Sequence, residues 1–147
     1  MSLENLKIRQ ELRDLVDAYA YLGDEKKIDQ QMELFTTDAT YKVYMNGIEV
    51  AFTAGTETLQ KEFKTHAAEV KTYFTLNGQH TVRIEGSDTT GISYSQLKMI
   101  REKDGQHIIT DYSIKYEDVY IQQQGKWLIK ERIGHFLIIE SRTLHNG

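Results

Sequence analysis

The chain has 147 residues, close to the usual size of one domain and enough to fold around a core without a disulfide or metal. It contains no cysteine, so disulfide bonds, thiolate zinc sites and a cysteine nucleophile are excluded. The formal net charge is −4 with acidic and basic residues interspersed, which gives no basic surface for nucleic acid or an anionic membrane. We therefore expect one domain, spanning residues 1–147, that binds neither.

The first segment has the pattern of an amphipathic helix. Apolar residues recur at helical spacing from Leu12 to Leu22, while charged residues fall mostly on the opposite side. Gly23 follows the last periodic residue, so the pattern predicts a helix over about residues 3–22. The first twelve residues are charged throughout, unlike a signal peptide, and no apolar run approaches the ~20 residues of a membrane span. A cytoplasmic protein is expected.

A second helix is predicted to begin near Asp24. The carboxylate of Asp24 is well placed as its N-cap, since it can accept a hydrogen bond from the free amides there. Ile28, Met32 and Phe35 share one face of this helix. The pattern then breaks, and two strands are expected at about residues 40–45 and 48–52. The pair Asn46-Gly47 joins them, because both positions tolerate the positive φ angles of a tight hairpin.

After a third helix, at about residues 56–68, apolar and polar residues alternate with a period of two. Four long strands are expected, at residues 73–85, 90–101, 107–122 and 126–142. Consecutive long strands form a meander that curls because sheets twist, and the helices need its concave face as an apolar surface to cover. The sequence thus predicts an α+β fold, with N-terminal helices packed on a strongly curved, mainly antiparallel sheet that encloses a pocket.

Three stretches that together span most of the chain carry a resemblance to a known family. They are Tyr19–Asp24 with Leu34–Ala39, then Val82–Asp88, and finally Tyr116–Asp118 with Gly125–Ile129 and Arg132. These stretches resemble the SnoaL-like family of the nuclear transport factor 2-like superfamily, whose members include scytalone dehydratase and bile acid dehydratase. The resemblance implies the cone-shaped fold described above and a homodimer formed through the outer face of the sheet.

The resemblance also implies a set of site residues. In such relatives an aspartate at the first interhelical turn holds a histidine, and a nearby aromatic hydroxyl polarises the substrate carbonyl. Asp24 matches that aspartate, Tyr19 matches the aromatic position, and Arg132 matches an arginine that some members use in the pocket. The family histidine falls at about residues 73–75, where this chain has Tyr-Phe-Thr, and a second titratable position falls near Met99. Both groups are absent, so Asp24 is either a base without that partner or only a helix cap.

Other histidines of this chain are candidates to replace the missing base. His80 shares the strand parity of its apolar neighbours, so it is expected to point inward, as a shifted base or as a hydrogen-bonded core residue. His135 shares the parity of Trp127 and is expected to face the pocket as a ligand-binding residue, unless Gly134 marks a bulge that redirects it. His66, late in the third helix, is placed near the pocket mouth. No histidine pair has metal-ligand spacing, so neither metal nor cofactor is expected.

The strand predicted over residues 107–122 supplies the clearest pocket wall. Its even-numbered positions from 108 to 120 are mainly apolar and aromatic, whereas the odd-numbered ones are mostly polar. Tyr112 and Tyr116 are therefore the leading pocket tyrosines, and Asp118 is a polar anchor on the same face.

Nine tyrosines in so short a chain suit a half-polar cavity, because each buries a ring and keeps a hydroxyl that wants a partner. Tyr94, on the neighbouring strand, is expected to add to the lining. Either Tyr41 or Tyr44 completes it, with Tyr44 preferred, but the choice depends on strand register, which inverts with a slip of one residue.

Two functions of different classes are consistent with these residues. The first is a cofactor-independent lyase, such as a dehydratase, or an isomerase that acts on a small hydrophobic or cyclic substrate. Asp24 or His80 would be its base, and Tyr19 with a strand tyrosine would donate to a developing oxyanion. The second is a non-catalytic ligand-binding module with the same pocket, since one fold hosts many activities. In both, the partner is a small hydrophobic or aromatic molecule.

Overall fold

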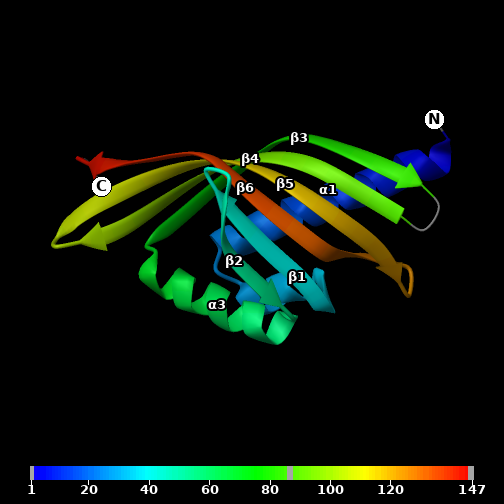
Figure 1. The fold of residues 1–147 in the computed structure, drawn as a ribbon, viewed down its shortest axis with the longest axis horizontal. Helices are drawn as coiled ribbons and strands as arrows, with labels where there is room; N and C mark the ends of the chain where they lie inside the picture. Colours follow the sequence, from blue (N-terminus) through cyan, green and yellow to red (C-terminus); the bar gives the residue numbers. More distant parts are fainter. Residues whose placement is uncertain (1, 86–87, 146–147) are drawn as a thin grey trace.

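The computed structural model describes residues 2–85 and 88–145. Its helices are α1 (Leu3–Asp24), α2 (Ile28–Met32) and α3 (Thr56–Glu69). Its strands are β1 (Phe35–Met45), β2 (Ile48–Ala54), β3 (Thr72–Glu85), β4 (Asp88–Lys103), β5 (Gln106–Gln123) and β6 (Lys126–Leu144). They form one sheet in the order β2-β1-β6-β5-β4-β3 (Figure 1), in which β1 and β6 are parallel and the other neighbours antiparallel. Residues 86 and 87, within the stretch Val82–Asp88 that resembles the family, lie outside the described residues.

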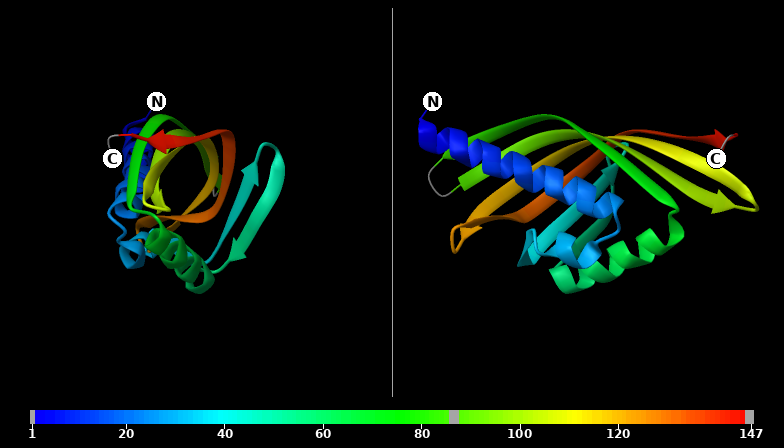
Figure 2. Two further views of the ribbon diagram at one scale, coloured as in Figure 1. Left: turned by 90° about the vertical axis from the view of Figure 1, so that its left-hand side faces the viewer. Right: turned by 180° about the vertical axis from the view of Figure 1, so that it is seen from behind.

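The sheet curls into a half-open cone, as predicted. Helix α1 runs along one side of the curl beside β3, and α3 lies across its lower opening, while the β1–β2 hairpin extends away from the curl (Figure 2). The buried face of α1 carries Leu12, Leu15 and Val16, which join the core with residues of β5. None of the helices in the described part of the chain is long and apolar enough to cross a membrane.

The second helix differs from the prediction. It spans only Ile28–Met32, its N-cap is Lys27 without a side-chain hydrogen bond, and Asp24 is the last residue of α1. Phe35 does not belong to this helix but begins β1. The reason is a sheet contact: the backbone N–H of Ile129 donates to the carbonyl of Leu34 at 2.8 Å, which draws this segment alongside β6. The predicted capping role of Asp24 is therefore wrong.

The hairpin at Asn46-Gly47 is confirmed, with φ angles of 52° and 82°. The turns after β4 and β5 use the same device, because Asp104-Gly105 and Gln124-Gly125 also have both φ angles positive. Such turns match the right-handed twist of the strands that they join, which keeps the long meander in register.

Two bulges in β6 decide which of its side chains face the cone interior. Between Glu131 and Ile129 its pairing with β5 skips Lys130, and between Ile138 and Phe136 it skips Leu137. Each extra residue reverses the alternation of side chains along the strand. Arg132, Gly134 and Phe136 consequently face inward, and His135 faces away from the cavity. The inward direction predicted for His135 is thus wrong, and the bulges lie at residues 130 and 137 rather than at Gly134.

Candidate functional site

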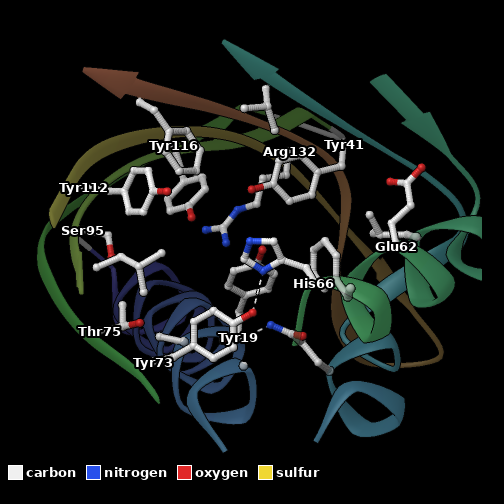
Figure 3. A pocket seen from close by; sticks show the side chains of 18 of the residues that line it. Tyr19, Tyr41, Glu62, His66, Tyr73, Thr75, Ser95, Tyr112, Tyr116 and Arg132 are labelled. Carbon is white, nitrogen blue, oxygen red and sulfur yellow. Dashed lines mark hydrogen bonds between the residues drawn. The ribbon is translucent and has the colours of Figure 1, made fainter. Parts of the chain in front are cut away.

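A cavity of about 380 Å³ lies between the concave face of the sheet, α1 and α3. Its lining is mostly apolar and aromatic, with a small number of polar groups at separate places (Figure 3). The aromatic lining residues are Tyr19, Tyr41, Phe63, Tyr73, Tyr112, Tyr116 and Phe136. A concave, mainly apolar site with few convergent polar groups is the usual form of a small-molecule site.

Arg132 of β6 is the cation of this cavity. Only 2% of it is exposed, and its guanidinium lies over the rings of Tyr19 and Tyr116, 4.2 and 3.8 Å from their centres. Nε and Nη2 donate to the two oxygens of Asp118 at 2.9 and 3.2 Å. Burial alone lowers the pKa of Arg132, but Asp118 and the tyrosines outweigh it and raise that pKa above its ordinary value, so the group stays charged.

The remaining guanidinium nitrogen, Nη1, is buried and has no hydrogen-bond partner within residues 2–85 and 88–145. Figure 3 shows the Arg132 guanidinium directed toward the middle of the lining side chains. A buried charged donor without a partner is costly unless another group completes it. The Oε1 atom of Gln31, another lining residue, is also buried and has no partner among the described residues. The cavity therefore offers a ligand a strong donor in Arg132 and an acceptor in Gln31.

A buried network behind the cavity holds Arg132 in place. The Tyr120 hydroxyl donates to Asp118 Oδ2 at 3.0 Å, and Nε2 of His80 lies 3.1 Å from that hydroxyl. Because the Tyr120 proton points to Asp118, His80 Nε2 is the donor in the second contact. Burial lowers the pKa of His80, which favours its neutral form. His80 is outside the cavity lining, and its hydrogen bond to Tyr120 links it through Asp118 to Arg132.

The tyrosine hydroxyls near Arg132 stay protonated at neutral pH. Burial raises the pKa of Tyr19, Tyr41 and Tyr116 above the ordinary tyrosine value, although the nearby Arg132 opposes the shift. Gly134 leaves space for Tyr116 and Tyr41, since a Cβ at position 134 would lie 3.2 Å from Tyr116 and 3.4 Å from the Tyr41 hydroxyl. These tyrosines can therefore donate hydrogen bonds but do not serve as anionic bases.

Asp24 is bonded to strand β3 rather than to helix amides. Its Oδ2 accepts from the backbone N–H of Thr75 at 2.8 Å, and its Oδ1 accepts from the Thr75 hydroxyl at 2.6 Å. Both residues line the cavity. Thr75 thus stands opposite Asp24, within the stretch 73–75 where the resemblance places a histidine. In the part of the chain that the structure describes, no histidine bonds directly to Asp24.

His66 of α3 and Tyr73 of β3 form another polar group in the cavity wall. Nδ1 of His66 lies 2.6 Å from the Tyr73 hydroxyl (Figure 3), and the two rings stack with centres 5.8 Å apart. The sequence placed His66 near the pocket, as the structure does, but assigned Tyr73 no role. The alternation along the strand could have indicated that Tyr73 lines the cavity, because Tyr73 and Thr75 lie on the same face of the strand.

The other predicted site residues are divided between the cavity and its outside. Tyr112 and Tyr116 line the cavity as expected, and Asp118 lies behind it as the partner of Arg132. Of the pair left open by register, the lining residue is Tyr41. Three residues proposed for ligand binding lie outside the lining, namely Tyr44, Tyr94 and His135.

Strand geometry explains these three exceptions. Tyr44 stacks on His135 with ring centres 5.2 Å apart, on the side of the sheet away from the cavity. Tyr94 is 39% exposed and pairs with Lys115, an odd-numbered and thus outward residue of β5.

Among the described residues, no group of three histidine, aspartate or glutamate side chains is arranged to hold a metal ion.

Comparison with known proteins agrees with this architecture. Among solved structures, a candidate scytalone dehydratase from Novosphingobium aromaticivorans superposes with a TM-score of 0.80 at 16% identity, covering 100% of this chain and 94% of its own. A nuclear transport factor 2-like protein with a cystatin-like fold from the same organism gives 0.71 at 22% identity, covering 92% and 85%. A LinA-type3 hexachlorocyclohexane dehydrochlorinase from Novosphingobium barchaimii gives 0.74 at 15% identity, covering 99% and 95%.

The helices, the curved mixed sheet and these superpositions define a cystatin-like, nuclear transport factor 2-like fold. At these identities the superpositions establish the fold alone. The sequence itself matches the SnoaL-like domain over residues 4–133. The chain therefore belongs to the SnoaL-like domain family, as its motifs indicated. No functionally curated protein matches the sequence significantly.

Proposed function

We propose that this protein is a cofactor-independent lyase or isomerase that acts on a small, largely apolar cyclic molecule bearing a carbonyl oxygen. The observation that carries the proposal is the unpartnered Nη1 of Arg132 at an aromatic cavity. A fixed cation in a site shielded from water stabilises negative charge that develops on a substrate oxygen. The aromatic lining suits a planar or cyclic carbon skeleton, and the cavity volume limits it to a few fused rings.

Asp24 is the base in this proposal. Its carboxylate takes a proton from a carbon next to the substrate carbonyl, and the electrons of that C–H bond move to the carbonyl oxygen as an enolate. Arg132 donates to that oxygen while the charge is present. In an isomerase the proton returns to a different carbon. In a lyase the proton taken by Asp24 is passed to a hydroxyl on the carbon next to the deprotonated one. That hydroxyl leaves as water, and a new carbon–carbon double bond forms. The hydrogen bonds from Thr75 orient the carboxylate for this step.

Hydrogen–deuterium exchange tests this chemistry without knowledge of the natural substrate. The probe is 2-tetralone, a bicyclic ketone with exchangeable protons beside its carbonyl, followed by NMR in D₂O. We expect the protein to accelerate exchange and Asp24→Asn to reduce that acceleration at least about 100-fold, since general base catalysis contributes about 10²–10⁴-fold. Asp14→Asn, an exposed change on the same helix, is the matched control and should keep the full rate. Equal rates in Asp24→Asn and Asp14→Asn would refute the role of Asp24.

A second function, ligand binding without chemistry, is favoured by one observation. Both oxygens of Asp24 already accept hydrogen bonds from Thr75, and no histidine of the described residues bonds to this carboxylate. If 2-tetralone binds in the cavity but its exchange is no faster than in buffer, this alternative replaces the enzyme. Binding is measured by isothermal titration calorimetry on the same samples.

A further inference from the structure

A chain of three side chains fixes the position of one proton at the more exposed end of the cavity. Arg101 of β4 places its Nη2 3.0 Å from Nε2 of His66, whose Nδ1 meets the Tyr73 hydroxyl. His66 and Tyr73 line the cavity, and His66 is more exposed to solvent than the buried Arg132. The group is therefore separate from the Asp118–Arg132 pair, although it belongs to the same cavity.

The direction of each hydrogen bond follows from what each group can donate. A guanidinium has donors only, so His66 Nε2 must be the acceptor from Arg101 and carries no proton. Neutral His66 then has its proton on Nδ1, which donates to the oxygen of Tyr73. The Tyr73 hydroxyl has thereby received a hydrogen bond, and its own proton remains free to be donated elsewhere. Within the described residues, no acceptor for it is found.

The ionisation states required by this arrangement are those that the surroundings favour. Burial, and to a smaller degree the charge of Arg101, lowers the pKa of His66, so the ring is neutral at pH 7. Burial likewise raises the pKa of Tyr73 to about 12, so its hydroxyl keeps its proton. A tyrosine with an imidazole donor behind its oxygen is a stronger hydrogen-bond donor than an isolated one, because hydrogen bonds in a chain polarise one another.

We propose that Tyr73 is a specificity-determining residue that donates its hydroxyl proton to a second oxygen of the ligand, with His66 and Arg101 as the residues that position it. This inference rests on the proposed function and narrows its substrate class: the molecule carries a carbonyl at the Arg132 end and a hydroxyl or second carbonyl at the Tyr73 end. Such a molecule is a cyclic ketone with a second oxygen rather than a hydrocarbon or a singly oxygenated ring.

Two probes that differ by one hydroxyl test the contact. Dissociation constants of 2-tetralone and 6-hydroxy-2-tetralone are measured by calorimetry for the unaltered protein, for Tyr73→Phe, and for Tyr94→Phe as an exposed control outside the cavity. We expect Tyr73→Phe to weaken 6-hydroxy-2-tetralone about fivefold, the usual effect of one neutral hydrogen bond, and to leave 2-tetralone unchanged. A purely structural role of Tyr73 would weaken both probes equally, and that result would overturn the inference. If neither probe binds the unaltered protein, the proposed function fails and the inference falls with it.

The proton position is measured without any ligand. Long-range ¹H–¹⁵N NMR spectra of histidine-labelled protein distinguish the two neutral tautomers of each ring. We expect His66 in the Nδ1–H form at pH 7.5, changing toward the Nε2–H form in Arg101→Met, because that variant removes the donor at Nε2. An Nε2–H ring in the unaltered protein would overturn the inference even if both probes bind.

Discussion

Replacing Asp118 by asparagine is expected to destabilise the protein strongly, because it leaves Arg132 as a buried charge without its counter-ion. The side chain of Asp118 is fully buried, and that of Arg132 is 2% exposed. Removing one member of a buried ion pair costs about 3–5 kcal/mol. For a chain of this length that corresponds to a decrease in melting temperature of roughly 10–15 °C. Thermal unfolding followed by circular dichroism gives the value.

The same strand provides a matched control in Asp111→Asn. Asp111 pairs with Lys98 at 2.8 Å and with Arg142, but these ions are on the outer face and partly exposed to solvent. Each exposed pair contributes only about 0–1 kcal/mol, so losing both pairs should lower the melting temperature by no more than about 6 °C. A double variant, Asp118→Asn with Arg132→Met, should be more stable than Asp118→Asn alone, because the uncompensated charge is gone. Equal melting temperatures for Asp118→Asn and Asp111→Asn would refute the reasoning.

Three further predictions follow from other parts of the structure. Burial lowers the pKa of both His66 and His80, so the unfolded chain takes up protons first as the pH falls. Stability should therefore decrease as the pH falls below about 6.5 and level off below the lowered pKa values. A melting temperature that increases as the pH is lowered over this range would contradict the assignment. Gly134→Ala should weaken 2-tetralone binding by crowding Tyr116, whereas unchanged affinity in calorimetry would show that the rings move aside. We also propose that two copies pair through the outer sheet face, which exposes apolar side chains such as Ile138. Light scattering should show a dimer, and Ile138→Glu should dissociate it. A monomer of the unaltered protein at micromolar concentration would exclude this dimer.

The sequence predicted the architecture because its strongest signals are local. Alternation along β5 identified the inward residues Tyr112 and Tyr116 correctly, and positive-φ pairs such as Asn46-Gly47 marked the turns. The family likeness located Asp24, and counting along β3 reached Thr75, which is its partner in the structure. Each of these inferences needs only spacing within one element or a few residues on either side.

What the sequence could not supply depends on pairing between distant strands. The bulge at Lys130 is a feature of the register of β6 against β5, and it reverses the direction of His135. No glycine or proline next to Lys130 marks this bulge in the sequence. The contact of His66 with Tyr73 needs the end of α3 to be placed against the start of β3 in three dimensions. His80 faces the interior by parity, yet Tyr120 stands between it and the cavity.

In the proposed function Arg132 is the group that holds the ligand oxygen, and a crystal structure of the protein with 6-hydroxy-2-tetralone tests this directly. We predict the carbonyl oxygen within about 3 Å of Nη1 of Arg132, the ordinary length of an N–H···O hydrogen bond, and the ring hydroxyl beside Tyr73. A ligand bound in the cavity with its carbonyl turned away from Arg132, or bound outside the cavity, would contradict the proposal.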